Sequence, residues 1–434
     1  MQSTALSIAA MKTGPAMAAT GSANEKLDMA IIGVGGQGTY SYRNVQKENM
    51  VAVADVDFER AGVPYTRFEK SAQFTDYRRM LDKMHKSLDA VVVATPDHTH
   101  FHPAYTAMDM GLHLYLEKPM AHNVWEIRKL TEIAAEKGLA TQLGMQRHTH
   151  GPMHRISELI QTRAIGDITE VHSWVDSDRG MFPNNKAPNG IPKTLDYDLW
   201  LGPVKHKPYA PNVTPYGWRF LWDFGTGEAG NWGCHILDIP FDALGIDYPT
   251  HAGATGPEPH PEMTTKEMHS WFDFPAKGNR KAVKLNWYQV KGGPKILKDL
   301  NLSPDGNNNL FIGTKGMLLC GFGQFTVLQQ DADGNWVTKA TQKDSMEFEM
   351  PEQYIPDSPG FHNEWLNACK DQGPAPTCNF SYSGPLSETV LLANTAYRSQ
   401  SEFDWDHETM TCIDAPAAHA HIKPNYKRGW KIRA

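Results

Sequence analysis

A glycine-rich turn directly after a short apolar segment constrains the fold of this chain more than any other feature. The apolar residues 27–32 predict a strand, and residues 50–54 predict a second strand that ends just before Asp55. Between them stand three glycines in the spacing G-x-G-x-x-G: Gly33, Gly35 and Gly38. A strand, this turn, a helix and a second strand that ends at an acidic residue about 20 positions later form the dinucleotide-binding fingerprint. The pattern predicts an N-terminal Rossmann domain.

Each position of this turn has a physical role in holding a dinucleotide. The first glycine permits the tight turn, the second lets the backbone approach a pyrophosphate, and the third lets helix and strand pack closely. The first N–H groups of the helix then face the phosphate charge, so Gly36 and Gln37 are expected beside the cofactor as well. Asp55 can accept hydrogen bonds from the ribose hydroxyls and would repel a 2′-phosphate. The expected cofactor is therefore NAD rather than NADP.

Length and charge narrow the class of protein further. A chain of 434 residues is long enough for two domains. Its net charge of −7 provides no electrostatic footprint for nucleic acid, and the basic residues among its last twelve positions are interpreted as a surface segment. No long apolar run follows residue 26, so no membrane span is expected. The five cysteines lack any paired spacing and are expected to be free thiols.

The first 26 residues differ in character from the rest of the chain. Residues 4–20 are small and apolar, and Ala16-Met17-Ala18 is similar to a signal-peptidase site, although a basic segment before them is almost missing. Two interpretations follow: the end of an export signal, or an arm that lies on a partner subunit. We expect export, hence a periplasmic or secreted protein, with a cytoplasmic location as the alternative.

Four further motifs follow the fingerprint. Residues 88–94 are an unbroken apolar run typical of a buried parallel strand, and strand and helix patterns alternate around it. The motifs are Ala94-Thr-Pro-Asp-His-Thr-His100, Glu117-Lys118-Pro119, Gly144-Met-Gln-Arg147 and Gly230-Asn-Trp-Gly-Cys-His-Ile-Leu-Asp238. These motifs occur in the order found in the Gfo/Idh/MocA family of sugar oxidoreductases. The sequence resembles that family over most of the chain from residue 27 to the end.

The resemblance implies an α/β protein of two domains. A doubly wound parallel sheet is expected over residues 27–147, and a C-terminal α/β domain with a large, mainly antiparallel open sheet over residues 148–434. Alternating segments such as residues 267–274 and 282–290 predict strands of that sheet. A final helix near residues 387–399 is expected to pack back on the first domain. The family commonly dimerises through this sheet, so a homodimer or homotetramer is expected.

The resemblance also implies a catalytic pair, Lys118 and His235. Hydride transfer from a sugar carbon needs a base for the hydroxyl proton and a positive group beside the developing oxyanion. Lys118 follows a parallel strand, at the edge where doubly wound sheets bind ligands. Many family members carry Asp four residues before the histidine, whereas this chain has Asn231, which can orient a sugar hydroxyl but cannot titrate. Asp238, one helical turn after His235, is expected to contact the substrate.

Several residues at the ends of the parallel strands are expected to line the cofactor cleft: Thr95, Pro96, His98, His100, Glu117, Lys118 and Gln146. Three histidines at alternate positions, His98 to His102, raise the possibility of a metal. The segment is interpreted as a loop that enters a helix, however, and no carboxylate pairs cleanly with these histidines. No metal site is therefore expected.

A long aromatic segment precedes His235. Residues 197–224 contain eight aromatic side chains and four prolines, which predicts an ordered loop without regular structure. Aromatic faces suit the C–H faces of pyranose rings. Trp218 and Arg219 from this segment, with Arg147, are expected to bind the substrate. As a set these residues favour a carbohydrate over a small hydroxy acid.

Three functions are compatible with these features. The first is an NAD-dependent oxidoreductase that acts on a hydroxyl of a sugar or glycoside. The second, known among relatives of the family, is a redox-neutral glycosidase with tightly bound NAD, in which transient oxidation permits elimination, water addition and re-reduction. The second function is favoured by the aromatic segment, by the expected export and by Asn231. A sensor without activity is the third, and intact Lys118 and His235 argue against it.

Overall fold

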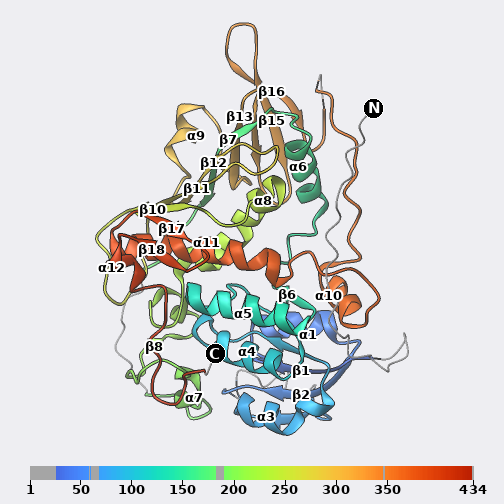
Figure 1. Cartoon of the computed structure of the whole chain (residues 1–434), viewed down its shortest axis with the longest axis vertical. Coiled ribbons are helices and arrows are strands. Elements are labelled where there is room, and N and C mark those ends of the chain that lie inside the picture. Colours follow the sequence, from blue (N-terminus) through green and yellow to red (C-terminus); the bar gives the residue numbers. More distant parts are fainter. Residues whose placement is uncertain (1–25, 58, 60–67, 182–189, 346–347, 433–434) are drawn as a thin grey trace, which may run out of the picture.

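The computed structural model describes residues 26–57, 59, 68–181, 190–345 and 348–432 (Figure 1). Two sheets organise this part of the chain, one of six strands and one of ten. The export-like or arm-like segment expected at residues 1–26 lies outside the described residues except for Lys26.

The first sheet is wholly parallel in the order β3-β2-β1-β4-β5-β6. Its strands are β1 (Asp28–Ile32), β2 (Asn49–Ala54), β3 (Ala72–Phe74), β4 (Ala90–Val93), β5 (His113–Leu116) and β6 (Thr141–Leu143). The helices between them are α1 (Gln37–Val45), α3 (Tyr77–Met84), η1 (His85–Ser87), η2 (Asp97–Thr99), α4 (Phe101–Asp109) and α5 (Val124–Lys137). Strand order reverses between β1 and β4, and ligands bind at such a switch point in doubly wound sheets. The predicted Rossmann domain is confirmed.

The second sheet has the order β16-β15-β14-β13-β7-β12-β11-β10-β17-β18. Its strands are β7 (Ile168–Val175), β10 (His251–Thr255), β11 (Met268–Phe274), β12 (Val283–Gln289), β13 (Asn309–Gly313), β14 (Met317–Cys320), β15 (Phe325–Gln330), β16 (Trp336–Thr341), β17 (Phe403–Asp406) and β18 (Thr411–Ile413). Among the described strands, β7 and β12 form its parallel pair and the other neighbours are antiparallel. This arrangement confirms the expected large, mainly antiparallel sheet.

Helices join the two sheets into one molecule. The helices outside the parallel sheet include α6 (Gly151–Gln161), α7 (Tyr197–Leu201), α8 (Cys234–Leu244), α9 (Lys295–Asp299), α10 (Phe361–Cys369) and α12 (Pro416–His419). The long helix α11 (Phe380–Ser399) crosses the middle of the molecule and packs against α5 (Figure 1). A buried ion pair of 2.8 Å joins Arg128 of α5 to Glu388 of α11. Helix α11 begins earlier than the expected residue 387, because the Asn379 side chain caps its first turn.

The aromatic segment contains more regular structure than the sequence predicts. Besides α7, it includes the short strands β8 (Pro211–Asn212) and β9 (Thr214–Pro215) and the 3₁₀ helix η3 (Gly217–Phe220). Several of its side chains, among them Trp200, Trp218 and Phe224, form a separate buried cluster. The expectation of a loop without regular elements was therefore wrong, because these rings supply enough apolar area for local packing.

Two sequence predictions concern the whole chain. No helix in the described ranges is long and apolar enough to cross a membrane. The five cysteines are buried free thiols, as their spacing predicted.

Candidate active site

A cavity of about 840 Å³ lies at the switch point of the parallel sheet. The glycine turn after β1 and the loops after β2, β4, β5 and β6 form one part of its wall. The aromatic segment and the start of α8 form the opposite part. A single cavity therefore receives residues from both domains.

The glycine turn is built for close approach of a ligand to the backbone. A Cβ atom on Gly38 would lie 1.9 Å from the carbonyl oxygen of Gly33, so α1 can pack on β1 only with glycine there. Gly33 has a φ of 83°, and its own Cβ would lie 2.8 Å from the carbonyl oxygen of Ala94. Gly33, Gly35, Gly36 and Gln37 all line the cavity. These tight contacts and the helix N-terminus fit a dinucleotide pyrophosphate.

Asp55 occupies the end of β2 and also lines the cavity. Its carboxylate accepts hydrogen bonds from the backbone N–H of Val34 and of Asp57, both at 2.9 Å. Burial raises the pKa of Asp55, and these donated hydrogen bonds oppose that shift. The carboxylate thus orders the glycine turn from the side where the adenosine ribose is expected.

Glu117 is buried beneath the cofactor side of the cavity. It accepts hydrogen bonds at Oε1 from Gln146 Nε2 at 3.0 Å and from Ser41 Oγ at 3.2 Å. Gln37 Nε2 lies 3.4 Å from the same oxygen. Burial raises the pKa of Glu117 to about 7, whereas the neighbouring Lys118 opposes the shift. Glu117 therefore connects α1, β5 and the loop after β6, and both it and Gln146 line the cavity as expected from the sequence.

Three expected cofactor residues do not reach the cavity. Gly38 is one of them and serves the packing of α1 on β1 instead. Thr95 and Pro96 line it, but His98 and His100 are absent from its wall. His98 bonds to the carbonyl oxygens of Trp200 (2.9 Å) and Phe224 (3.2 Å). His100 bonds to the carbonyl oxygens of Pro119 and Thr95. The expectation that both histidines line the cofactor cleft was therefore wrong. Their rings are buried and form hydrogen bonds that connect neighbouring loops.

Lys118 projects from the loop after β5 into the cavity. Its Nζ donates to the backbone oxygen of Asn231 at 2.6 Å and to the Oδ1 of the same residue at 3.1 Å. Burial lowers the pKa of Lys118. Asn231 belongs to a π-helical segment, η4 (Ala229–Gly233), and its amide also donates to Glu228. Asn231 therefore holds the ammonium group through a neutral amide.

His235 lies in the first turn of α8 and reaches the same cavity. Its Nδ1 is buried and has no hydrogen-bond partner among the described residues. Burial holds the pKa of His235 well below its usual value, and the charges of Lys118 and Arg147 lower it further. Burial and these two charges therefore favour the neutral form of the imidazole.

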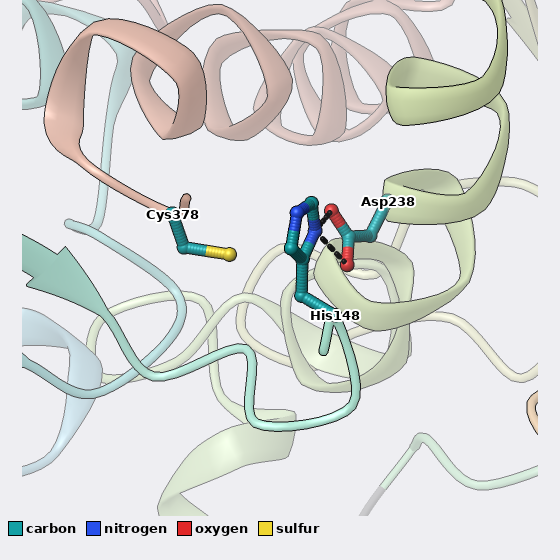
Figure 2. A group of neighbouring side chains, drawn as sticks. All are labelled: His148, Asp238 and Cys378. Atoms are coloured by element: carbon teal, nitrogen blue, oxygen red, sulfur yellow. Dashed lines mark hydrogen bonds and ion pairs between the residues drawn. The ribbon is translucent and has the colours of Figure 1, made fainter. Parts of the chain in front are cut away.

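Asp238 is turned away from the cavity, contrary to the expected substrate contact. Figure 2 shows its carboxylate directed at the imidazole of His148, and its two oxygens lie 2.9 and 3.0 Å from Nδ1. Tyr382 also donates to it at 2.6 Å. The prediction overlooked His148 as a partner, because residues 90 positions apart in the sequence gave no sign of this contact.

The same group includes a thiol and has the composition of a metal site. His148, Asp238 and Cys378 offer ligand atoms within 4.8 Å of one another. In Figure 2, however, the imidazole lies between the carboxylate and the sulfur, and its Nδ1 faces the carboxylate. Burial opposes charge on His148, but Asp238 outweighs it and raises the pKa of His148 well above its usual value. The arrangement is that of a buried ion pair.

The substrate side of the cavity carries aromatic and cationic side chains. Trp218, Arg219 and Arg147 all line it, as the sequence suggested. Arg179 and Tyr216 are additional residues of this wall that the sequence analysis did not single out for the substrate. Tyr216 belongs to the aromatic segment and could have been chosen from it. Arg179 follows β7, a strand the sequence analysis did not identify, and no motif marks it.

The C-terminal tail contributes an unexpected residue, Trp430, to the cavity. Its carbonyl oxygen bonds to His102 Nε2 at 2.8 Å, and the Arg78 guanidinium lies 4.9 Å from its ring. The backbone N–H of Lys427 donates to Pro203. The basic end of the chain is thus docked against α3, α4 and the aromatic segment at the cavity wall.

The fold and the cavity define a class of protein: an NAD-binding oxidoreductase with a Rossmann domain and a C-terminal sheet domain. Residues 27–145 match the family model described as "Oxidoreductase family, NAD-binding Rossmann fold", and residues 171–264 match "Oxidoreductase family, C-terminal alpha/beta domain". The chain belongs to the Gfo/Idh/MocA oxidoreductase family.

Individual relatives are distant. Inositol 2-dehydrogenase of Rubrobacter xylanophilus is 29% identical over 157 residues, which cover 35% of this chain and 44% of that protein. The chain thus spans less than half the length of the first curated relatives it matches.

Two solved structures share the fold. The WlbA dehydrogenase of Chromobacterium violaceum, in complex with NADH and UDP-GlcNAcA, is 15% identical with a TM-score of 0.62, and the match covers 88% of this chain and 97% of that one. A levoglucosan dehydrogenase in complex with NADH is 17% identical with a TM-score of 0.58, covering 88% and 99% of the two chains.

Proposed function

We propose that this protein oxidises a hydroxyl group of a sugar or glycoside, with Lys118 and His235 as the catalytic pair. One observation carries the proposal: the two side chains enter one cavity that also contains the glycine turn. Dehydrogenases of inositol and of levoglucosan among the relatives support a polyhydroxylated substrate. When bound, NAD supplies the acceptor for the hydride.

The two residues have different roles in this proposal. The neutral form of His235 can accept the proton of the reacting hydroxyl. Lys118 donates hydrogen bonds, and its ammonium group stabilises the negative charge that develops on the substrate oxygen. Asn231 fixes the direction of the Lys118 side chain through two acceptors. The neutral amide does this without binding a proton itself.

Substitution of each catalytic residue tests the assignment. Lys118→Met and His235→Ala are each expected to lower kcat by roughly 10²- to 10⁴-fold, the usual contribution of a positioned acid or base. The affinity for NADH, measured by fluorescence titration, is expected to change little in both variants. Activity near that of the wild type in either variant would remove that residue from the mechanism.

A redox-neutral glycoside hydrolase is the second candidate. The position of Trp430 at the cavity wall supports it, because a docked tail would retain the cofactor between turnovers. In this reaction the same pair would move protons while an oxidised sugar eliminates its aglycone, adds water and is reduced again. A retained cofactor would also suit the export that residues 1–26 suggest, and the N-terminal sequence of the mature protein tests that export.

One assay separates the two candidates. Purified protein is incubated with aryl glycosides and with free sugars, with and without added NAD. Aglycone release without net NADH supports the hydrolase, whereas NADH in proportion to sugar supports the dehydrogenase. If neither aglycone release nor NADH formation is observed, both candidate functions are contradicted.

We further propose that the protein is a homodimer or homotetramer that associates through the ten-stranded sheet. Trp271, Tyr288 and His269 lie on one face of neighbouring strands as half-buried rings, and His269 stacks on Tyr288 with centroids 4.2 Å apart. Light scattering of the wild type and of Trp271→Asp tests this: the variant is expected to have the lower mass. A monomeric wild type would overturn the proposal.

A further inference from the structure

The charged side chains of the cavity wall differ in how far the protein itself supplies their hydrogen-bond partners. Four cationic side chains line the cavity: Lys118, Arg147, Arg179 and Arg219. The carboxylates on the cavity wall, among the described residues, are Asp55, Asp57, Asp97 and Glu117. Each of these acids already accepts hydrogen bonds from the protein, from Val34, Thr194, Thr226 and Gln146 respectively.

Arg179 is neutralised by the protein. Its guanidinium forms an ion pair of 2.8 Å with Glu228, a side chain with no exposed area, and donates to the Tyr216 hydroxyl. A buried carboxylate of this kind requires a partner, and Arg179 supplies it. Arg179 therefore has a structural explanation and is not an open cation of the site.

Arg219 forms no ion pair with any carboxylate that the structure describes. Its guanidinium stacks on the rings of Trp218 (4.2 Å to the centroid) and Tyr216 (4.7 Å). The one hydrogen bond it makes among the described residues is a long one of 3.4 Å to the Tyr216 carbonyl oxygen. A guanidinium has five N–H donors in a planar fork, so most of its donors remain available on the cavity wall.

The surroundings make an unpaired cation costly. Burial lowers the pKa of Arg219, and the charge of Arg179 lowers it further against the opposing effect of Asp97. Arg147 lies on the same wall, has no carboxylate partner in the described part of the chain and packs 4.5 Å from the Phe322 ring. Asn231 is neutral, so it adds no negative charge to this side. A ligand that carries a negative group would supply acceptors for these unpaired guanidinium donors.

We propose that the substrate is an anionic sugar and that its negative group, a carboxylate or a sulfate ester, binds the Arg219 guanidinium. This inference rests on the proposed function, because it specifies the substrate of the same cavity. Two oxygens of a carboxylate or of a sulfate ester can accept two parallel hydrogen bonds from the guanidinium fork. The rings of Trp218 and Tyr216 hold the fork in place, so little side-chain freedom is lost on binding.

Matched pairs of sugars test the charge requirement. Binding to the NADH-loaded protein is measured by calorimetry for glucose against glucuronate and for galactose against galacturonate. The binding of galactose 6-sulfate is measured as well, so that a site for a sulfate ester can be distinguished from a site for a carboxylate. At least one acid is expected to bind about tenfold or more tightly than its neutral partner. The proposal would be overturned if every acid bound as weakly as its neutral partner or more weakly. It would also be overturned if neither the acid nor the neutral sugar of any pair bound at all.

Substitution of Arg219 tests the residue. Arg219→Gln is expected to reduce the preference for the acid over the neutral sugar by roughly 10- to 100-fold, because a charge-assisted hydrogen bond is lost. Arg219→Lys, which keeps the charge but not the fork, is expected to retain part of the preference. Arg43→Gln, at an exposed position in the last turn of α1, is the matched control and is expected to keep it fully. An unchanged preference in Arg219→Gln would remove Arg219 from the site.

These measurements distinguish a failure of the proposed function from a failure of the proposed anion site. Acid-selective binding without NADH formation or aglycone release contradicts the proposed function but leaves the anion site standing. Turnover of neutral sugars without any preference for acids supports the proposed function and overturns the anion site.

Discussion

At the scale of single residues, the contact between Lys118 and Asn231 is the central feature of the site. The ammonium group has two acceptors from one residue, and neither carries a charge. Its pKa is therefore lowered by burial without a neighbouring carboxylate in contact to restore it. A lysine held in this way titrates closer to neutral pH than an exposed one.

Asn231→Asp tests this electrostatic role. A carboxylate in place of the amide favours the charged ammonium and is expected to raise the pKa of Lys118 by about one unit or more. Because the protonated form stabilises the oxyanion, activity is lost as pH rises through this pKa. The alkaline limb of the kcat profile should therefore move to higher pH in the variant. Asn363→Asp, exposed on α10, is the control, and an unmoved limb in Asn231→Asp would contradict the role.

At the scale of elements, the turn between β1 and α1 permits no side chain at its third glycine. Gly38→Ala would place a methyl group 1.9 Å from the Gly33 carbonyl oxygen, so α1 must move away from the sheet. NADH affinity is expected to fall by about 100-fold or more, because the displaced helix N-terminus no longer contacts the pyrophosphate. A 100-fold loss corresponds to a few kcal/mol of binding free energy. Fluorescence titration measures it. Gly151→Ala, at the start of α6 where a Cβ meets nothing within 4 Å, should bind NADH normally.

The His148–Asp238 pair joins α8 to the loop after β6 and contributes to stability. Asp238→Asn removes one charge of a buried pair and is expected to lower the free energy of unfolding by about 3–5 kcal/mol. Urea denaturation measures this loss. Wild-type stability in the variant would show that the pair contributes nothing.

The pH dependence of this pair has a definite sign. The pKa of His148 is raised in the folded protein, so its contribution is fully present below the unfolded-state pKa of about 6.5. It is lost as pH rises through the raised folded pKa. The stability difference between wild type and Asp238→Asn should therefore shrink at alkaline pH.

At the scale of the whole molecule, the two ends of the cofactor site come from distant parts of the chain. The glycine turn lies at residues 33–38, whereas Trp430 stands near the C-terminus. The tail reaches this position through contacts with His102, Arg78 and Pro203. We therefore expect the docked chain end to slow the release of the cofactor.

Trp430→Ala is expected to release NADH faster, by about tenfold, because an aromatic contact at the cavity wall is lost. Stopped-flow fluorescence after mixing with excess NAD measures the dissociation rate. Trp336→Ala, on the edge strand β16 of the other domain, is the control and should leave that rate unchanged. An unaltered rate in Trp430→Ala would show that the tail does not retain the cofactor.

Local patterns predicted the Rossmann half of this protein well. The glycine spacing, the apolar runs of β1 and β4 and the acid after β2 act over short stretches of chain, where backbone sterics and hydrophobic burial decide the structure. Thr95, Glu117, Lys118 and Gln146 follow the parallel strands and therefore line the cavity. Strand β7 and Arg179 after it were missed, because no motif marks either.

The sequence by itself determined the fold class, the cofactor and the identity of the two residues proposed for catalysis, because each depends on a local motif. Only the tertiary structure decided which polar side chains face the cavity. His98, His100 and Asp238 bond to distant partners and turn away from it. Arg219 keeps most of its donors because no carboxylate among the described residues forms an ion pair or hydrogen bond with it. Pairing between remote residues depends on how the domains pack, and no short stretch of sequence encodes that.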